Sequence, residues 1–308
     1  MAGILKYSKS LDSAAVKAAQ GILNVRVVCS QKIPKGEVNY AYKVETDEGT
    51  FLVKAFGKLW TDDGLLRWVS QALAERGIQH PKIIYCSRGS KYFPFGFAIL
   101  EYVEGQTGYD AISREVGLED FYFRVGKILK AVHEIELLRY GDINNGQGEC
   151  YDLVEFILKD IDDCCKELPR NILSDNSRGK AKQIIRDILV SHKEKFKPAL
   201  VHWDATPDNC VLTPSKEIVL IDWDNAMALP WLQDLAVITY WEERKEDMVR
   251  DAFLRGHGFE KFAFDEIVEI ERTLQIWFAI RLLPFFYFEK QSVKSTRGIK
   301  EKLIRLLK

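Results

Sequence analysis

The sequence lacks the long apolar runs that membrane spans require. Its most apolar stretch, residues 275–288, is too short to cross a bilayer and is interrupted by Arg281 and Pro284, so we expect a buried helix there. The first residues, Met1 to Lys6, lack the long apolar core of a signal peptide. We therefore expect a cytoplasmic protein that does not bind a membrane.

Paired cysteine motifs and metal-binding histidine patterns are also missing. No C-x-x-C pair occurs, and the adjacent Cys164 and Cys165 can form neither an ordinary disulfide nor a zinc knuckle. Reduced thiols are the simplest interpretation. His80, His192 and His257 show no metal-ligand spacing. The six cysteines are Cys29, Cys86, Cys150, Cys164, Cys165 and Cys210.

A strong charge of either sign is absent as well. The formal net charge is −1, so nothing implies binding to nucleic acid or to an anionic membrane. The charge is unevenly distributed, however. The first 100 residues contain 14 Lys and Arg against 8 Asp and Glu, and the remaining residues contain 30 against 37. A basic first part suits phosphate groups and an acidic second part suits cations, although ordinary scatter of surface charge explains the difference equally well.

The patterning of the 308 residues predicts an α+β protein in two parts. Residues 22–30, 40–46, 50–56, 82–86 and 95–102 read as strands, and apolar residues at helical spacing before Gly77 predict one helix between the third and fourth. Residues after Gly105 are mostly helical, as in 121–135 and 153–161, and the runs 199–201 and 218–221 predict a small hairpin. The expected domains are residues 1–104, a small antiparallel sheet, and residues 105–308, which are mainly helical.

The segment from Val201 to Asn209 carries the strongest chemical signal. It has the spacing H-x-D-x-x-x-x-N, which includes Asp204 and Asn209, and Asp222 ends an apolar run a dozen residues later. Phosphoryl transfer from a nucleotide needs an acidic group near the acceptor hydroxyl and oxygen ligands for magnesium. This spacing is that of the protein-kinase catalytic loop.

Two features of the first part suit a nucleotide. Lys54 lies within the apolar strand 51–56, where a charged group is costly unless an anion pairs with it, although a strand lysine can also point to solvent. Gly36, in the turn between the first two strands, would let backbone N–H groups approach phosphates, but it suits an ordinary hairpin turn equally well.

Together these motifs resemble the aminoglycoside phosphotransferase and choline kinase family. The matching parts occur in the order G-x-x-N (Gly36 to Asn39), Val53-Lys54, Leu100-Glu-Tyr-Val103, His133, His202-x-Asp204-x-x-x-x-Asn209, Ile221-Asp222-Trp223 and Asp234-Leu-Ala236. The resemblance implies a bilobal protein-kinase-like fold.

The resemblance also implies a role for each motif. The turn at Gly36 and Asn39 would cover the nucleotide phosphates, and Lys54 would hold the α- and β-phosphates of ATP. The carbonyl of Glu101 and the N–H of Val103 would read adenine. Asn209 and Asp222 would bind Mg²⁺, and Asp204 would deprotonate the acceptor. His133 and His202 would be structural, and Asp234 would brace the catalytic loop.

Two departures from the family pattern stand out. Trp203 occupies a place usually taken by glycine or another small residue. The carboxylate expected to pair with Lys54 is not obvious, with Asp63 the first candidate and Asp62 the second.

The acceptor is the least determined part of the reaction. We expect a nucleoside triphosphate donor and a small hydroxylated acceptor, such as an aminoglycoside, whose cationic groups would suit the acidic second part. A metabolic kinase for choline, homoserine or a sugar is the alternative, followed by a pseudokinase that only binds nucleotide. The sequence leaves the oligomeric state open. Candidate acceptor residues, each of which can equally be core or surface, are Tyr151, Asp152, Glu155, Tyr240, Trp241, Glu242, Glu243, Trp277 and Phe278.

Overall fold

The computed structural model describes residues 9–34, 38–57, 63–259 and 264–308. They form two compact units. Unit 1 contains the described residues up to Thr107 together with Cys210–Asp224, and unit 2 contains Gly108–Asn209 and the described residues from Asn225 onward. The sequence assigns residues 210–224 to the larger domain. In the structure they belong with the first unit, because β9 (Cys210–Leu212) pairs with β6 (Gln106–Thr107).

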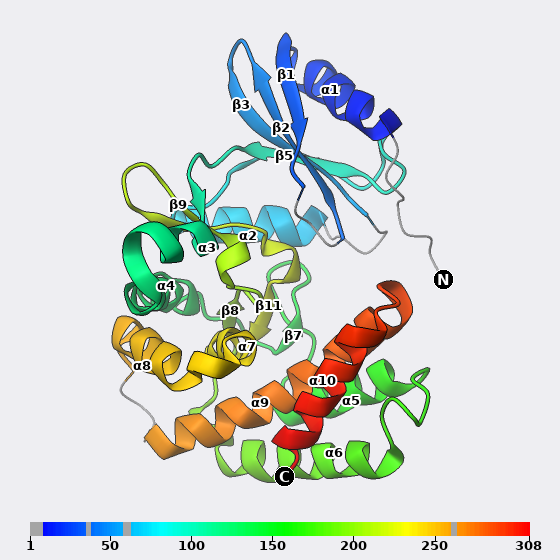
Figure 1. Ribbon diagram of the computed structural model, residues 1–308, viewed down its shortest axis with the longest axis vertical. Helices are drawn as coiled ribbons and strands as arrows, with labels where there is room; N and C mark the ends of the chain where they lie inside the picture. Colours follow the sequence, from blue (N-terminus) through cyan, green and yellow to red (C-terminus); the bar gives the residue numbers. More distant parts are fainter. Residues whose placement is uncertain (1–8, 35–37, 58–62, 260–263) are drawn as a thin grey trace. The chain divides into compact units, whose positions relative to one another are not determined.

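Unit 1 is built on the expected antiparallel sheet (Figure 1). The strand order is β1-β2-β3-β5-β4, and every neighbouring pair is antiparallel. Lys54 lies on the central strand, opposite Ala41 on one side and Ala98 on the other. The strands are β1 (Val27–Lys32), β2 (Tyr40–Thr46), β3 (Gly49–Ala55), β4 (Ile83–Ser87) and β5 (Phe97–Glu101).

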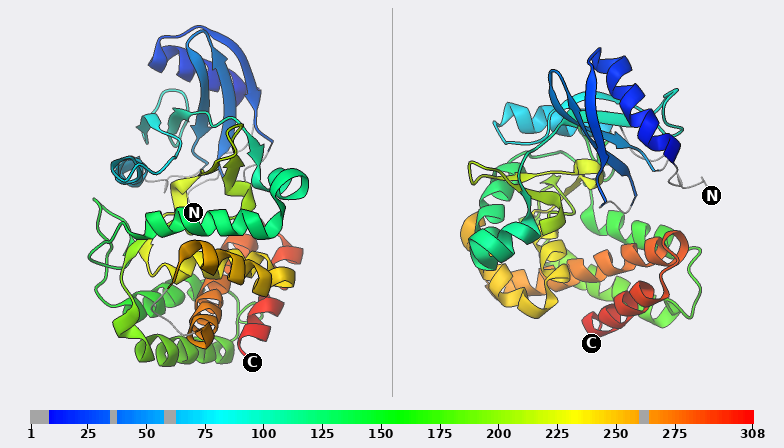
Figure 2. Two further views of the ribbon diagram at one scale, coloured as in Figure 1. Left: turned by 90° about the vertical axis from the view of Figure 1, so that its left-hand side faces the viewer. Right: turned by 45° about the horizontal axis from the view of Figure 1, so that its top comes forward.

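One face of this sheet is covered by helix α1 (Lys9–Leu23), which lies along the strands in Figures 1 and 2. Buried Leu11, Ala15, Ala18 and Ala19 recur at helical spacing and pack in one core with Val53 and other residues of the sheet. The prediction of a strand from residue 22 is therefore wrong at its start, because residues 22 and 23 complete this helix.

The opposite face of the sheet carries helix α2 (Asp63–Glu75). Its Leu66 packs with Phe56, Cys86 and Ala98. Because successive side chains of a strand point to opposite faces, Lys54 points away from the face that Val53 shares with α1.

The predicted hairpin of residues 199–201 with 218–221 is also wrong, although both runs are strands. β8 (Ala199–Val201) pairs with β11 (Met227–Leu229), and β10 (Ile218–Leu220) pairs with β9. The cause is a tight turn after the catalytic loop, in which Thr213 N donates to the Glu217 carbonyl at 2.8 Å. The turn therefore makes β9, the strand directly before β10 in the chain, its partner.

Unit 2 is mainly helical, as expected. Helices α4 (Gly117–His133) and α8 (Glu246–His257) approach closely because each has a glycine at the contact. A Cβ on Gly126 would lie 2.3 Å from the Phe253 carbonyl oxygen, and a Cβ on Gly256 would lie 1.9 Å from the Phe123 carbonyl oxygen. The helices are α3 (Gly108–Ala111), α4 (Gly117–His133), α5 (Leu153–Cys165), α6 (Asp175–Ser191), α7 (Leu232–Trp241), α8 (Glu246–His257), α9 (Phe264–Pro284) and α10 (Val293–Leu306), and β7 (Gly141–Asp142) completes the sheet with β11 and β8.

Residues 275–280 of α9 are buried, which agrees with the expectation of a buried helix. Within the described ranges, no helix is both long and apolar enough to cross a membrane.

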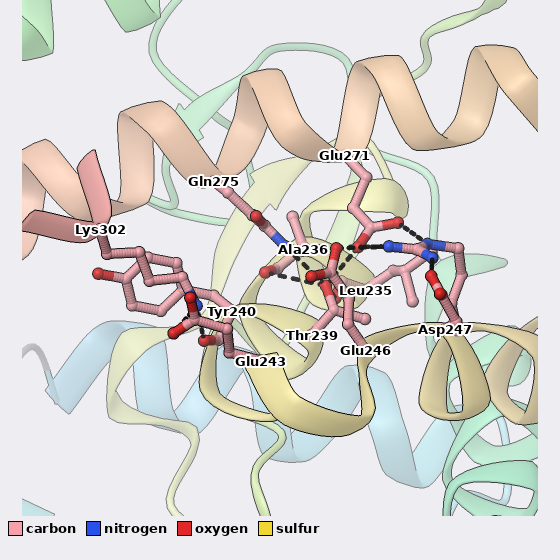
Figure 3. A network of polar contacts seen from close by, with 11 residues as sticks. Leu235, Ala236, Thr239, Tyr240, Glu243, Glu246, Asp247, Glu271, Gln275 and Lys302 are labelled. Atoms are coloured by element: carbon pink, nitrogen blue, oxygen red, sulfur yellow. Dashed lines mark hydrogen bonds and ion pairs between the residues drawn. The ribbon is translucent and has the colours of Figure 1, made fainter. Parts of the chain in front are cut away.

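A buried polar network joins three of these helices. Figure 3 shows Glu271 of α9 directed toward Thr239 of α7, whose hydroxyl donates to it at 2.5 Å. Arg250 of α8 donates from Nε to the same carboxylate at 2.5 Å, and Gln275 Nε2 donates to Thr239 Oγ1 at 3.0 Å. All four side chains are buried, so the network fixes the mutual positions of α7, α8 and α9.

Candidate active site

Lys54 of unit 1 is held between two carboxylates. Its Nζ lies 2.6 Å from Asp222 Oδ1 and 2.7 Å from Asp224 Oδ1, and its side chain is 9% exposed. A lysine pointing to solvent is therefore excluded. Burial alone would lower the pKa of Lys54, but the charges of Asp222 and Asp224 outweigh it and raise the pKa, so the ammonium stays protonated.

The carboxylate partner of Lys54 differs from the prediction. Asp63 lies 3.3 Å from Arg88 Nε, and Asp62 falls outside the described residues. The partner that the sequence analysis did not name is Asp224, although it stands only two residues after Asp222. An acidic residue repeated at that spacing, directly after a buried strand, is the signal that could have found it.

Asn39 connects Asp224 to the start of the segment after β3. Its Nδ2 donates to Asp224 Oδ2 at 2.7 Å, and its Oδ1 accepts from Gly57 N at 2.9 Å. A Cβ on Gly57 would lie 1.8 Å from the Val38 carbonyl oxygen, so only glycine permits this approach. Gly36 lies outside the described residues.

The cluster has a surplus of negative charge. With both carboxylates ionised, Lys54, Asp222 and Asp224 carry one net negative charge. Burial raises the pKa of Asp224, the charge of Asp222 raises it further, and the charge of Lys54 opposes both. A cation bound beside these groups would relieve the remaining repulsion.

Asp222 is presented by a left-handed backbone, with φ of 64°. Asp tolerates this conformation better than bulkier residues do. The indole of Trp223 donates from Nε1 to the Leu220 carbonyl at 3.2 Å, which ties the turn to the end of β10. The Asp222 side chain is 44% exposed and remains accessible to a ligand.

Glu101 and Val103 lie where the sheet ends. Glu101 is the last residue of β5, and its N–H donates to the Lys82 carbonyl at 2.9 Å. Val103 follows the strand, and no hydrogen bond from its N–H is found within the described ranges. A main-chain donor at this edge therefore remains for a ligand of unit 1.

In unit 2, the loop of residues 202–209, which we call the catalytic loop after its expected role, is closed by Asn209. Its Nδ2 donates to the Asp204 carbonyl at 2.9 Å and to Asp204 Oδ2 at 2.8 Å. Because the amide nitrogen is used in both bonds, its Oδ1 is the atom left to bind a cation. The His202 Nδ1 accepts from Asp204 N at 3.3 Å, which supports the structural role expected for His202.

Trp203 has an unfavourable backbone conformation, with φ of 69°. For a non-glycine residue this costs about 1–2 kcal/mol. The carboxylate of Asp234 stabilises it by accepting from Trp203 N at 2.7 Å and from His202 N at 2.9 Å. The indole ring is covered by Arg281, whose guanidinium lies 5.0 Å from the ring centroid, and its edge contacts Trp277. The large side chain at this position is thus accommodated in the core of unit 2.

The residues considered for acceptor binding mostly have other partners. Tyr240, Trp277 and Phe278 are buried, and Glu243 lies 2.6 Å from Arg305. Tyr151 and Trp241 are exposed.

Negative charge nevertheless gathers around Tyr109 of α3. Burial raises the pKa of Tyr109, and the nearby carboxylates of Asp208, Glu242 and Asp204 raise it further.

The oxygen donors fit magnesium rather than a metal bound by protein alone. The described residues contain no group of three or more His, Cys, Asp and Glu that could hold a metal ion. Magnesium is usually bound through one or two protein oxygens, and water and phosphate oxygens complete its shell. The accessible carboxylate of Asp222 and the amide oxygen of Asn209 are donors of this kind.

Comparisons with solved structures find other proteins with a similar fold. The chain is similar to choline kinase LicA from Streptococcus pneumoniae, with 15% identity, a TM-score of 0.70 and coverage of 96% of this chain and 98% of the other. It is similar to aminoglycoside phosphotransferase APH(4)-Ia, with 15% identity, a TM-score of 0.70 and coverage of 96% and 99%. Spectinomycin phosphotransferase APH(9)-Ia matches with 16% identity, a TM-score of 0.63 and coverage of 96% and 97%.

A search of curated proteins finds no match. The model of the phosphotransferase enzyme family matches residues 30–267, well over half of the chain. This range contains Lys54, Asp204, Asn209 and Asp222. The chain therefore belongs to the phosphotransferase enzyme family and has a protein-kinase-like fold.

Proposed function

We propose that this enzyme transfers the γ-phosphoryl group of ATP to a hydroxyl group of a small, cationic acceptor such as an aminoglycoside. The observation that supports the reaction most directly is the buried Lys54 between Asp222 and Asp224. A lysine paired with carboxylates inside a sheet is costly to maintain unless it serves a ligand, and in kinases the strand lysine binds nucleotide phosphates.

The groups of unit 1 suit the nucleotide. Lys54 would donate to the α- and β-phosphates, and the turn from Gly36 to Asn39 would supply backbone N–H groups to them. Asn39 supports this role because its side chain is fixed by Asp224 and Gly57. The carbonyl of Glu101 and the N–H of Val103 would bind the adenine edge.

Magnesium would be held by Asp222 and Asn209 and would neutralise charge on the phosphates. The single net negative charge of the Lys54 cluster supports a cation there. Asn209 also donates to Asp204, so the same side chain would set the position of the base and present an oxygen to the metal.

Asp204 would accept the proton of the acceptor hydroxyl. Its Oδ2 is oriented by the Asn209 amide at 2.8 Å, and the backbone before it is fixed by Asp234. Positioning of this kind accounts for most of the rate enhancement in phosphoryl transfer, where the protein does little covalent chemistry.

A cationic acceptor is supported by the carboxylates of Asp204, Asp208 and Glu242 around Tyr109. Solved relatives have been crystallised with hygromycin B and AMP-PNP, and with spectinomycin and ADP. The similarity to a choline kinase keeps choline as the second candidate acceptor.

The test is a panel of acceptors that includes aminoglycosides, choline, homoserine and neutral sugars, incubated with radiolabelled ATP with and without magnesium. We expect label transfer to an amine-bearing acceptor only with magnesium, and KM for that acceptor to rise with salt because screening weakens charge attraction. Label transfer only to neutral or anionic acceptors would contradict the cationic assignment. ATP binding without transfer to any acceptor would favour a pseudokinase.

The two metal ligands can be compared directly. Asp222→Ala should reduce the magnesium-dependent part of ATP affinity more than Asn209→Ala does, because a carboxylate contributes a full charge and an amide only a dipole. Titration of ATP into each variant, with and without magnesium, measures this. An unchanged magnesium dependence in Asp222→Ala would contradict its role as a ligand.

A further inference from the structure

Two buried histidines of unit 2 are connected to the catalytic loop by hydrogen bonds through Asp234. His133 ends α4 and His257 ends α8. His133 Nε2 lies 3.0 Å from Asp234 Oδ2, and His133 Nδ1 lies 3.0 Å from His257 Nε2. Since Asp234 also accepts the N–H groups of His202 and Trp203, a continuous chain of hydrogen bonds runs from α8 to the backbone before Asp204.

The His257 ring is held firmly in this chain. It stacks on Trp231 at 4.4 Å with an interplanar angle of 18°, and on Phe253 at 5.6 Å with an angle of 15°. The backbone approach of α4 and α8 at Gly126 and Gly256 brings the two histidines together. Neither the position nor the orientation of His257 can change without disturbing these contacts.

The hydrogen bonds determine which nitrogens carry protons. A carboxylate only accepts, so His133 Nε2 must donate to Asp234. When His133 is neutral it has one N–H group, so its Nδ1 then accepts and the donor is His257 Nε2. Nδ1 of His257 is left without a proton and has no hydrogen-bond partner among the described residues. The neutral state is consistent with the burial of His257, which is 8% exposed.

We propose that His257 is a positioning residue that locks His133 in the tautomer protonated at Nε2. In that tautomer His133 donates to Asp234, and Asp234 keeps both oxygens directed at the left-handed turn that presents Asp204. Without the donor on His257, His133 can place its proton on Nδ1, and its bare Nε2 then repels the Asp234 carboxylate. This proposal rests on the proposed role of Asp204 as the base.

A purely packing role makes a different prediction. His257→Phe keeps an aromatic ring against Trp231 but removes the donor. His257→Gln loses the ring but places an amide N–H near the position of Nε2. If His257 acts through its proton, the Gln variant should retain more activity than the Phe variant, and if it acts only by packing, the order should be reversed.

The kinetic experiment measures kcat and KM for ATP in both variants and in His80→Gln. His80 is a matched control because it hydrogen-bonds Ser70 and the Ile78 carbonyl within unit 1. We expect kcat to fall ~10- to 100-fold in His257→Phe with KM for ATP unchanged, because the base is displaced while the nucleotide groups are intact. His257→Gln should recover most of kcat. Wild-type kcat in His257→Phe would overturn the proposal.

A spectroscopic measurement makes the proposal independent of activity. Long-range ¹H–¹⁵N spectra of the ring nitrogens distinguish protonated from unprotonated positions, and the chain has only five histidines to assign. We expect His133 to be protonated at Nε2 alone in the unmodified protein and in His257→Gln, and to populate the other tautomer in His257→Phe. His133 protonated at Nδ1 alone in the unmodified protein would refute the proposal even if no variant folds.

Failure of the proposed function would look different. Full activity in Asp204→Asn would contradict the assignment of Asp204 as the base, while the His133 spectrum could still agree with the positioning proposal. If His133 has the other tautomer and Asp204→Asn is strongly impaired, the positioning role of His257 is contradicted and the role of Asp204 as the base is supported.

Discussion

Trp203 and Asp222 both have backbones in the left-handed region, and each lies at or beside a carboxylate that the proposed reaction uses. Strained backbone of this kind persists only when the surroundings hold it in place, and it is common at functional sites. Here the holding groups are identifiable. Asp234 binds the N–H of Trp203, and Trp223 ties the Asp222 turn to Leu220.

The first prediction concerns the base. Asp204→Asn should lower phosphate transfer at least ~100-fold, as expected for loss of a general base, and should leave ATP affinity nearly unchanged. The matched control is Asp163→Asn, an exposed acidic residue of α5 outside the proposed site. Turnover of the Asp204 variant comparable to that of the control would contradict the assignment.

A second prediction concerns the buried ion pair of Lys54. Asp224→Ala removes one of its two partners and the acceptor for Asn39, while Asp222 still pairs with Lys54, so the free energy of unfolding should fall by about 1–3 kcal/mol. Chemical denaturation measures this value. The comparison is Asp47→Ala, which breaks the exposed pair with Arg26 and should cost no more than about 1 kcal/mol. Equal losses in both variants would show that Asp224 carries no special role.

The sequence predicts this chemistry well where the signal is local. Asp204 and Asn209 lie five residues apart, and their hydrogen bond follows from that spacing. Asp224 was not predicted as the partner of Lys54, because the two residues are far apart in the chain and the repeat of Asp222 and Asp224 indicates an acidic site without specifying its cation. The expectation of Asp63 came from the family pattern, in which a carboxylate on the helix pairs with the lysine, and in the structure Arg88 binds Asp63 instead.

At the scale of helices and strands, local patterns predict the elements better than their pairing. The alternation in residues 40–46 and 50–56 predicts β2 and β3, and a tight turn joins them into neighbours. The run 199–201 is a strand as expected, but its partner β11 comes from beyond Asp222, which no local pattern specifies. Helix α1 was missed because the alternation that predicts a strand from residue 22 overlaps its last turn.

The third prediction belongs to the network of α7, α8 and α9. Glu271→Ala leaves the guanidinium of Arg250 buried without its main partner, so the free energy of unfolding should fall by about 3–5 kcal/mol. Replacing both residues, as in Arg250→Met with Glu271→Leu, should recover most of that loss because no unpaired charge remains.

Equilibrium denaturation of the single and double variants provides the test. Asp163→Ala is the reference, since its pair with Lys159 is exposed and its loss should have little effect on stability. A double variant that is less stable than Glu271→Ala would show that the network stabilises the three helices beyond pairing its own charges.

For the whole molecule, the acid sensitivity of folding provides a fourth prediction. Burial lowers the pKa of His257 from 6.5 to about 3, and the neighbouring His133 ring and the charge of Lys130 act in the same direction. The unfolded chain therefore binds a proton more readily than the folded protein between these values. Stability from this group is fully present above pH 6.5 and is lost as the pH falls toward 3, at no more than about 1.4 kcal/mol per pH unit.

The measurement is the free energy of unfolding of wild type and His257→Phe at pH 7 and pH 5. Groups that do not contact His257 contribute equally to both proteins, so the difference between the two slopes isolates His257 and its contact with His133. We expect a smaller loss in the variant. Parallel slopes would mean that His257 titrates normally in the folded protein.

The pairing of Lys54 with Asp222 also determines when unit 1 can be completed during synthesis of the chain. The two residues are 168 positions apart, and a chain leaves the ribosome from its N-terminus. At ~5–20 residues per second, the five-stranded sheet of unit 1, whose last strand ends at Glu101, is complete roughly 6–24 s before these carboxylates emerge. During that time Lys54 has neither Asp222 nor Asp224 beside it, and β6 has no β9. Unit 1 therefore reaches its final form only after residues 210–224 have been made, so a nascent chain that ends before Asp222 lacks both carboxylate partners of Lys54.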